Sequence, residues 1–409
     1  MTTPNGPILF NTEEGSDTQA SGLGPPVARY GTGASTTGSS AVVTGIDTTN
    51  VLPGDLLWVQ SSSGRQFSII YTVDSSTQVT CDDVFANTES GRTWAIGGKR
   101  ATIQGSSALF VDDIGYVLIE LETDQDLTQA IALSAPVTVR SNEAGVKRTI
   151  NQQSDSTPIF EFSLSNRIVF RDIKFLNTSS IKERCFKKIA NNSVIRLEDC
   201  IVGETGSGFS YALSVSNYNT YICTRTVFRG CTFGFYGTYN NTGTPAVFKE
   251  CWFDNCDYGA WASHLQPVIA ENCVFSNCSQ IALQNTLAFS AFYRREIKGC
   301  IFYNNNIGIA TGSSYFPGLS NQHIYYVDDC IFLNNTTAIS SYGQFNFSFN
   351  RTGFVGNTAN KINVVDWEDI NPLNLSTDPF VDAANGNFNI NTSNAGGRTL
   401  RATNYTIGD

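Results

Sequence analysis

The chain has few of the side chains that most often bind metal ions or nucleic acids. Its 409 residues include only two histidines, His264 and His323. Neither lies at zinc-finger spacing from a cysteine pair, so we expect no metal site, and no cofactor is expected either. Acidic residues outnumber basic ones by 36 to 26. The net charge of −10 repels phosphate backbones, so nucleic acid is not an expected partner.

Long apolar runs are also missing. No stretch reaches the roughly 18 apolar residues of a membrane-spanning helix, so we expect no membrane insertion. The opening "MTTPNGPILFNTEEGSD" lacks the basic start and apolar run of a secretory signal. Runs rich in Ala, Glu, Lys and Leu are absent, which argues against a helical protein. The hydrophobic fraction of 41% nevertheless allows a sizeable core and excludes a disordered chain.

Cysteine, in contrast, is frequent, and it belongs to a repeat. Without a secretory signal, we expect the eleven cysteines to be free thiols. "KECWFDNCDYGAW" from Lys249 and "AENCVFSNCSQIAL" from Ala270 both contain Cys-x-Phe-x-Asn-Cys. Alignment of similar stretches gives a repeat of 20 to 31 residues, a length typical of solenoids. The first position of the repeat is then filled by Ile173, Cys200, Cys231, Cys251, Cys273, Cys300, Cys330 and Thr352.

Each repeat has the pattern of two short strands joined by a turn. Apolar and polar residues alternate in "RREIKGCIFYNN" and "YYVDDCIFLNN", which indicates a strand. The Cys and Phe are two residues apart and therefore share one face. Parallel stacking of such units places like residues above one another, roughly 4.8 Å apart, with Cys and Phe inside. The asparagine two residues after Phe marks the turn, at Asn177, Asn255, Asn277, Asn304 and Asn334.

Over about residues 115–385, this repeat resembles the right-handed parallel β-helix proteins of the pectate-lyase-like architecture. The resemblance implies an all-β fold, and the right-handed crossover rule agrees with its handedness. We expect the β-helix over residues 99–385, with a closing strand and tail over 386–409. The cysteine column, which is thin and apolar, is expected to consist of Cys200, Cys231, Cys251, Cys273, Cys300 and Cys330.

The N-terminal part differs in composition from the repeat. Residues 1–40 are rich in Gly, Ser and Thr without apolar periodicity, and we expect an extended arm there. Residues 41–98 contain short β-rich runs separated by turns, which predicts a small β domain. This stretch and "GRTWAIGGKRATI" from Gly91 resemble the attachment regions that precede β-helices in bacteriophage virion proteins.

Catalytic candidates come from the resemblance, because polysaccharide-cutting members of this architecture carry acidic clusters on an outer sheet. A carboxylate pair about 5 to 9 Å apart could hydrolyse a glycoside. Solvation of the coil surface is the favoured interpretation of these acidic residues. The basic run "IKERCFKK", which includes Arg184, is likewise expected to be a solvated loop. If the protein is an enzyme, the candidates are Asp328, Asp329, Asp366 and Asp369.

Aromatic residues, among them Tyr211, fall mainly in the segments between motif positions. Their flat apolar faces and hydroxyl groups suit sugar rings or a protein interface, while core packing and subunit contact are competing explanations. Trp252 lies between Cys251 and Phe253 and should therefore point outwards, where it could fill a subunit interface. The binding candidates are Tyr236, Tyr239, Tyr315, Phe316, Trp252 and Trp261.

The leading hypothesis is a structural, adhesive bacteriophage virion protein, either a tail spike, a tail fibre or a head-decoration fibre. It would attach to other virion proteins through its N-terminal region and present the β-helix to a host-surface glycan or receptor. The resemblance to phage spikes, with the usual closed symmetry of oligomers, implies a homotrimer. A polysaccharide hydrolase or lyase on the same scaffold is the main alternative, since fold does not determine function. A bacterial surface adhesin is the third.

The stacked repeat generates a prediction about the thiols. The six column cysteines should react with a thiol reagent only after unfolding, because buried apolar thiols are inert. Titration of the native and the denatured protein measures this directly. Rapid labelling of the native column would contradict the stacking.

Overall fold

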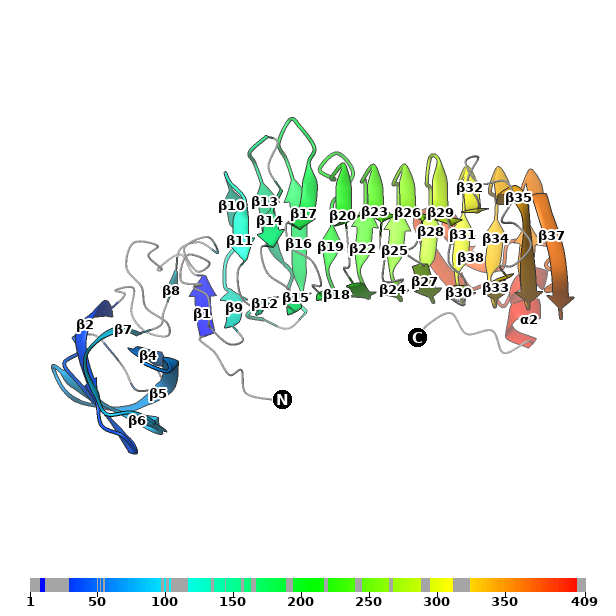
Figure 1. The fold of residues 1–409 in the computed structure, drawn as a ribbon. Coiled ribbons are helices and arrows are strands. Elements are labelled where there is room, and N and C mark those ends of the chain that lie inside the picture. The colour runs from blue at the N-terminus through cyan, green and yellow to red at the C-terminus, as the bar shows by residue number, and fades with distance from the viewer. Residues whose placement is uncertain are drawn as a thin grey trace. The chain divides into compact units, whose positions relative to one another are not determined.

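The computed structural model describes most of the chain. The described residues are 8–11, 29–49, 51, 53, 56–96, 99–100, 103, 117–133, 136–143, 145–155, 158–162, 167–188, 194–216, 220–239, 245–264, 268–287, 295–311 and 324–402. They fold into a parallel β-solenoid preceded by an antiparallel β domain, as the sequence predicts (Figure 1). The chain divides into two compact units, residues 1–151 with 160–173 and residues 152–159 with 174–409.

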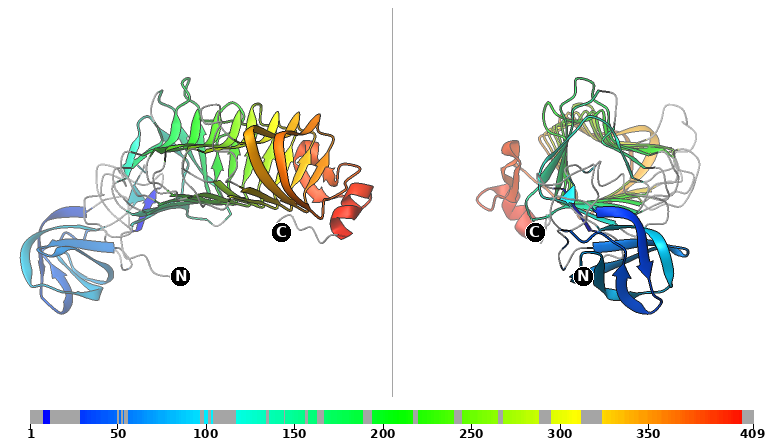
Figure 2. Two further views of the ribbon diagram at one scale, coloured as in Figure 1. Left: turned by 45° about the vertical axis from the view of Figure 1, so that its right-hand side comes forward. Right: turned by 90° about the vertical axis from the view of Figure 1, so that its left-hand side faces the viewer.

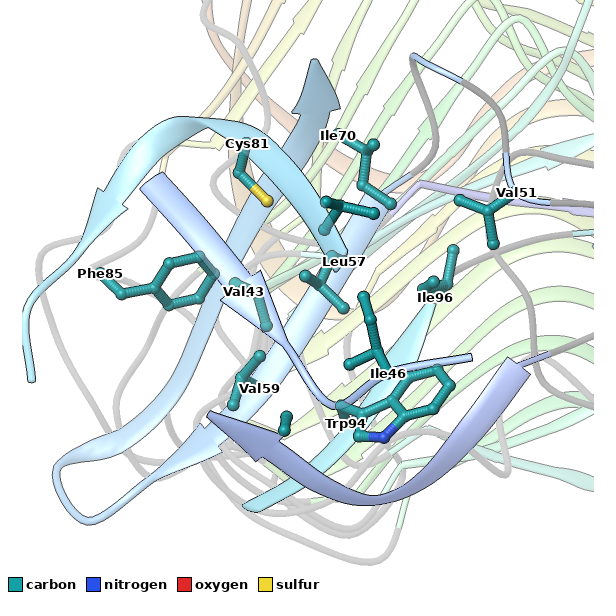
Figure 3. Close-up of a cluster of buried hydrophobic side chains, with 12 residues drawn as sticks. Val43, Ile46, Val51, Leu57, Val59, Ile70, Cys81, Phe85, Trp94 and Ile96 are labelled. Atoms are coloured by element: carbon teal, nitrogen blue, oxygen red, sulfur yellow. The ribbon is translucent and has the colours of Figure 1, made fainter. Parts of the chain in front are cut away.

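The N-terminal domain is a six-stranded antiparallel barrel with its own apolar core. Val43, Leu57, Val59, Ile70 and Trp94 are among the buried residues that fill it (Figure 3). Its strands run in the order β2-β3-β6-β5-β4-β7. They are β2 (Arg29–Thr36), β3 (Ser40–Thr44), β4 (Leu56–Ser61), β5 (Gly64–Ser75), β6 (Gln78–Phe85) and β7 (Glu89–Ile96).

The prediction of an extended arm over residues 1–40 is wrong for two segments, which form strands. Strand β2 pairs with β7 inside the barrel, and β1 (Ile8–Asn11) pairs in parallel with β9 (Val117–Leu121). A strand needs backbone hydrogen bonds and not apolar side chains, so a Gly- and Thr-rich sequence can supply one. Glycine allows close packing here, because a Cβ at Gly31 would lie 3.2 Å from the Trp94 ring, closer than ordinary van der Waals contact.

Among the described residues of the first unit, β1, β9 and seven further strands belong to the solenoid sheets. The second short strand of the solenoid, β13, ends at the boundary between the units. The two-residue strand β8 (Lys99–Arg100) also pairs with β1. The remaining strands of this part are β10 (Gln125–Leu127), β11 (Ile131–Leu133), β12 (Val137–Ser141), β13 (Arg148–Gln152), β14 (Phe160–Phe162) and β15 (Arg167–Arg171).

In the second unit, every full coil contributes one strand to each of three parallel sheets (Figures 1 and 2). The first sheet contains β18 (Val194–Glu198), β21 (Thr220–Thr224), β24 (Ala246–Lys249), β27 (Val268–Glu271), β30 (Arg295–Lys298) and β33 (Ile324–Asp328). The second contains β16 (Ile173–Asn177), β19 (Ile201–Val202), β22 (Val227–Arg229), β25 (Trp252–Asp254), β28 (Val274–Ser276), β31 (Ile301–Tyr303), β34 (Ile331–Leu333) and β36 (Gly353–Val355).

The third sheet contains the longer strands. In the last two coils, one continuous strand belongs to both the third and the first sheet. Strands β35 and β37 run on from the third sheet into the first. The third sheet contains β17 (Arg184–Lys188), β20 (Tyr211–Ser216), β23 (Phe233–Tyr239), β26 (Tyr258–His264), β29 (Ile281–Leu287) and β32 (Ile307–Thr311), followed by β35 (Thr337–Asn350) and β37 (Ala359–Ile370).

From β19 onwards, left-handed corners lie before and after the short strands of the second sheet. The corner after Phe has positive φ at Asn255, Asn277, Asn304 and Asn334, as predicted, but not at Asn177. The corner before the cysteine position was not predicted. Asparagine fills it once, and other residue types fill it elsewhere, so no residue type marks it in the sequence. Its residues with positive φ are Asp172, Asp199, Arg225, Glu250, Asn272, Gly299, Asp329 and Arg351.

Phenylalanine rings form the inner column of the second sheet. The rings of Phe228, Phe253, Phe275, Phe302, Phe332 and Phe354 stack in sequence. Neighbouring ring centres are 4.7 to 5.1 Å apart and the rings lie within 12° of parallel. The strand spacing of about 4.8 Å therefore sets the ring spacing, and the column buries one aromatic side chain in each coil.

One member of the predicted cysteine column is wrong. Val202 pairs with Phe228, and Phe228 pairs with Phe253, so Thr226 and not Cys231 occupies the first position of that coil. The spacing then becomes regular, with 26 residues from Cys200 to Thr226 and 25 from there to Cys251. The alignment failed because "TVFRGCTFGF" offers both Thr-x-Phe and Cys-x-Phe, and residue identity favoured the second.

Cys231 belongs to a second inner column that begins with cysteine and continues with asparagine. Five of its six side chains donate a hydrogen bond to the carbonyl at the Phe position of the preceding coil, while Cys278 Sγ donates to the Ser276 carbonyl in its own coil. Cys256 Sγ donates to the Phe228 carbonyl, and Asn335 Nδ2 donates to the Phe302 carbonyl at 2.8 Å. Cysteine and asparagine are thus equivalent donors at this corner. The column consists of Cys231, Cys256, Cys278, Asn305, Asn335 and Asn357.

All eleven cysteines are free and buried, as the sequence predicts. Burial raises the pKa of Cys185, Cys223 and Cys278 well above the ordinary thiol value. The thiolate is therefore disfavoured, and the thiols act as small apolar packing groups with a weak donor.

The C-terminal segment packs against the outer face of the second sheet. Phe380, Leu373 and Leu400 cover Ile301 and Leu333 in one apolar cluster. The closing strand expected within residues 386–409 is β39, whereas the helix α2 was not expected. No helix among the described residues is long and apolar enough to cross a membrane. The segment contains β38 (Phe380–Asp382), the 3-10 turn η2 (Ala383–Asn385), β39 (Asn387–Ile390) and α2 (Ala395–Ala402).

The mixed column generates a prediction. Asn335→Ala should cost about 2 to 3 kcal/mol in unfolding free energy, because it leaves the Phe302 carbonyl and the Asn305 amide without their buried partners. Asn335→Cys should cost about 1 kcal/mol, since cysteine already fills this position in other coils. Urea unfolding measures both values.

Asn306→Ala is the matched control, because Asn306 is exposed and adjacent in the chain to the buried Asn305. It should change the unfolding free energy by less than about 0.5 kcal/mol. Equal costs for Asn335→Ala and Asn335→Cys would refute the equivalence of the two side chains.

Candidate functional site

Five aromatic side chains gather on the outer face of the third sheet. They belong to the strands β20, β23 and β26, which lie side by side in Figure 1. On these strands Leu213, Phe235 and Ala260 are fully buried and fill the coil interior. The aromatic residues on the other side of the strands are half-buried. We call this group the aromatic ladder, and its members are Tyr211, Phe233, Tyr236, Tyr258 and Trp261.

The ladder consists of two rows of stacked rings. In the first row, the ring centre of Phe233 lies 5.2 Å from that of Tyr211 and 4.6 Å from that of Tyr258. In the second, Tyr236 stacks on Trp261 at 4.6 Å with 6° between the ring planes. Edge contacts connect the rows, with Phe233 4.8 Å from Tyr236. Burial within the ladder raises the pKa of Tyr236.

The two ends of the ladder differ in chemistry. Arg184 precedes Tyr211 in the register, and its guanidinium carbon lies 5.2 Å from the centre of the Tyr211 ring. At the other end, Gln284 follows Trp261 in the register and Ile281 follows Tyr258. The ladder therefore begins at a cation and ends beside a neutral amide.

The predicted binding residues do not all belong to this group. Tyr236 and Trp261 are brought together as stacked neighbours. Tyr315 and Phe316 lie outside the described residues, as does the side chain of Tyr239, whose backbone ends β23.

Trp252 lies on a different face and is covered by its own chain. It points outwards from the second sheet, where Phe388 packs edge-on against it with ring centres 6.4 Å apart. Its indole Nε1 donates to Ser276 Oγ at 2.8 Å, and that hydroxyl donates to Asp254. Arg229 lies over the ring, 5.0 Å from its centre. Trp252 thus anchors the C-terminal segment.

Three members of the ladder, Tyr211, Phe233 and Tyr258, were not among the binding candidates. Phe233 was assigned to the inner column because it follows Cys231, and correcting that register moves it to the outer face. Tyr258 lies in the second of the two short strands expected in its repeat and was not named as a binding residue. The signal that could have found the last two is a shared spacing of 25 residues, from Phe233 to Tyr258 and from Tyr236 to Trp261.

The acidic candidates lie in ladders of alternating charge. Asp329 pairs with Arg351 at the corner before the cysteine position. Asp328 lies beside Lys298 in the register, Lys298 lies beside Glu271, and the Glu271 carboxylate is 2.8 Å from Lys249 Nζ. Like charges 4.8 Å apart would repel, so alternation is what the stacking requires. These positions are explained by the charge pattern of the coil surface.

The other two acidic candidates lie on β37, in the last coil. Asp369 is exposed and lies 3.9 Å from Lys361 Nζ, and the same ammonium group lies over the Phe349 ring at 4.1 Å. It also lies over the Phe354 ring, at 5.5 Å. The side chain of Asp366 lies outside the described residues. Within the described part of the chain, no group of His, Cys, Asp or Glu side chains is arranged to hold a metal ion.

Comparisons with known proteins found similarity to solved structures. No family model and no curated protein matches the chain. Similar solved structures include the catalytic domain of a GH87 alpha-1,3-glucanase in complex with tetrasaccharides and with nigerose. The identities are 10% and 12%, the TM-scores 0.32 and 0.31, and each match covers 84% of this chain and 87% of the other. An overlap this loose says nothing about the activity of this chain.

The charge ladder generates a prediction. Lys298→Glu should lower the urea midpoint, because it places three negative charges in adjacent coils, at Glu271, position 298 and Asp328. Added salt should restore part of the loss by screening. Lys298→Gln, the control, should change the midpoint much less. A midpoint for Lys298→Glu that does not respond to salt would contradict the electrostatic explanation.

Proposed function

We propose that the chain is a glycan-binding β-helix protein and that the aromatic ladder is its binding surface. The observation that carries this proposal is the gathering of five aromatic side chains on the outer face of one sheet. Their polar tips and apolar rings match the mixed surface of a sugar, which presents hydroxyl groups and apolar C–H faces. The strands that hold the rings are fixed by parallel pairing, so the surface is preformed.

Binding without cleavage is the better-supported form of this function. Asp329 pairs with Arg351, Asp328 lies beside Lys298, and Asp369 lies near Lys361. Each of these carboxylates has a charge partner of its own, and the ladder is not built around any of them. The polysaccharide-degrading alternative requires oligosaccharide release from host-surface glycans. Release that is lost on replacing Asp329 or Asp366 would overturn the non-enzymatic form.

The biological setting in this proposal is a bacteriophage particle, with the protein as an adhesive spike or fibre. The motivating features are the resemblance of residues 41–98 to phage attachment regions and the β-domain that precedes the solenoid. The N-terminal region would contact other virion proteins, and three copies would associate. Mass spectrometry of purified particles tests the location and would separate it from a bacterial adhesin. Light scattering near 44.5 kDa would rule out a stable trimer.

The binding function generates a prediction. Trp261→Ala should weaken binding to a bacterial surface glycan roughly tenfold, because it removes the larger ring of the second row. Binding is measured on an array of bacterial surface oligosaccharides and then by calorimetry. Tyr71→Ala is the control, since Tyr71 is 66% exposed and lies in the barrel. Equal effects of the two variants would contradict a role for the ladder.

A further inference from the structure

The stacking of the ladder limits where a sugar ring can lie. Both faces of Phe233 are covered, by Tyr211 on one side and by Tyr258 on the other, and the three rings are nearly parallel. One face of Trp261 is covered by Tyr236. A sugar that packs flat on an aromatic ring needs an uncovered face. Such a face remains only where the ladder ends.

At the Trp261 end, the next coil places a polar amide beside the indole. Gln284 pairs with Trp261 in the register and is half-buried, and Ala310 follows it. The large ring is therefore followed by smaller side chains, and its far face borders a neutral hydrogen-bonding group. An amide can donate to one sugar hydroxyl and accept from another. This end suits an uncharged part of a sugar.

At the opposite end, Arg184 supplies a cation. Its guanidinium group lies over the Tyr211 ring, and no described carboxylate pairs with it. When a guanidinium group stacks on an aromatic ring, its N–H donors point outwards in the plane of the guanidinium group. They remain available for a planar anion such as a carboxylate. In an acidic protein, a cation held in place with no acidic partner in the described part of the chain can select for an anionic ligand.

Taking the proposed glycan binding as its basis, we infer that the ladder selects acidic oligosaccharides, with a sugar carboxylate at Arg184 and a sugar ring on the free face of Trp261. Arg184, Tyr211, Phe233 and Tyr258 occupy successive coils in one register. Three strand spacings separate the first from the last, roughly 14 Å, which a short oligosaccharide can span. The ligand would therefore lie along the solenoid axis, across the coils.

The test is an array on which each uronic-acid-containing oligosaccharide is printed beside its carboxyl-reduced counterpart. The wild-type protein should bind the acidic member of a bound pair roughly fivefold to tenfold more tightly. Arg184→Gln should remove that preference and retain binding to the neutral member. Arg184→Lys should keep part of it, because a point charge replaces the planar fork. Trp261→Ala should weaken both members.

The controls separate this inference from the proposed function. Arg401→Gln removes an exposed arginine on α2 and should leave the preference unchanged. If the wild type binds acidic and neutral members equally, or if Arg184→Gln keeps the preference, the inference is wrong while glycan binding stands. If no oligosaccharide binds and Trp261→Ala changes nothing, the proposed function itself fails. Urea unfolding of Arg184→Gln shows that a change in preference is not a loss of folding.

Discussion

In-register parallel stacking is the constraint on which the rest of this structure depends. Each residue of a coil lies about 4.8 Å from its equivalents in the coils before and after it, so every position must tolerate contact with its own kind. Phenylalanine meets this condition by stacking, as between Phe253 and Phe275 at 4.8 Å. Asparagine meets it by hydrogen bonding, as Asn335 Nδ2 does to Asn357 at 2.9 Å. Charged residues meet it favourably by alternating, as Lys249 does with Glu271.

This constraint explains how much of the fold could be predicted from the sequence. Self-compatible residues recur, so the Cys-x-Phe repeat revealed the strands, the inner column and the asparagine corner. The corner before the cysteine position escaped prediction because its backbone geometry is enforced by the stack on residues as different as Arg225 and Gly299. The helix α2 and strand β2 escaped for a different reason. Neither takes part in the repeat, so only tertiary contacts define it.

The candidate site was harder to predict than the fold, because a register error of a few residues exchanges the inside and outside of a coil. The sequence alignment placed Cys231 in the first inner column and therefore Phe233 in the core. The central ring of the aromatic ladder was then not recognised as a surface residue. Trp252 shows that a correct register is not sufficient to predict a binding residue. Its outward direction follows from strand alternation, but the segment that covers it lies more than a hundred residues further along the chain, at Phe388.

Repetition and binding make opposite demands on a solenoid. A perfect aromatic column stabilises itself by closing every ring face with the next ring, which leaves little for a ligand to contact. The same holds for a perfect charge ladder, where each carboxylate already has its partner. Specific recognition therefore requires positions where a column changes residue type. On the third sheet these are the steps from Arg184 to Tyr211 and from Trp261 to Gln284, where a ring meets a guanidinium group and an amide. In such a fold, the departures from the repeat are the places to look for function.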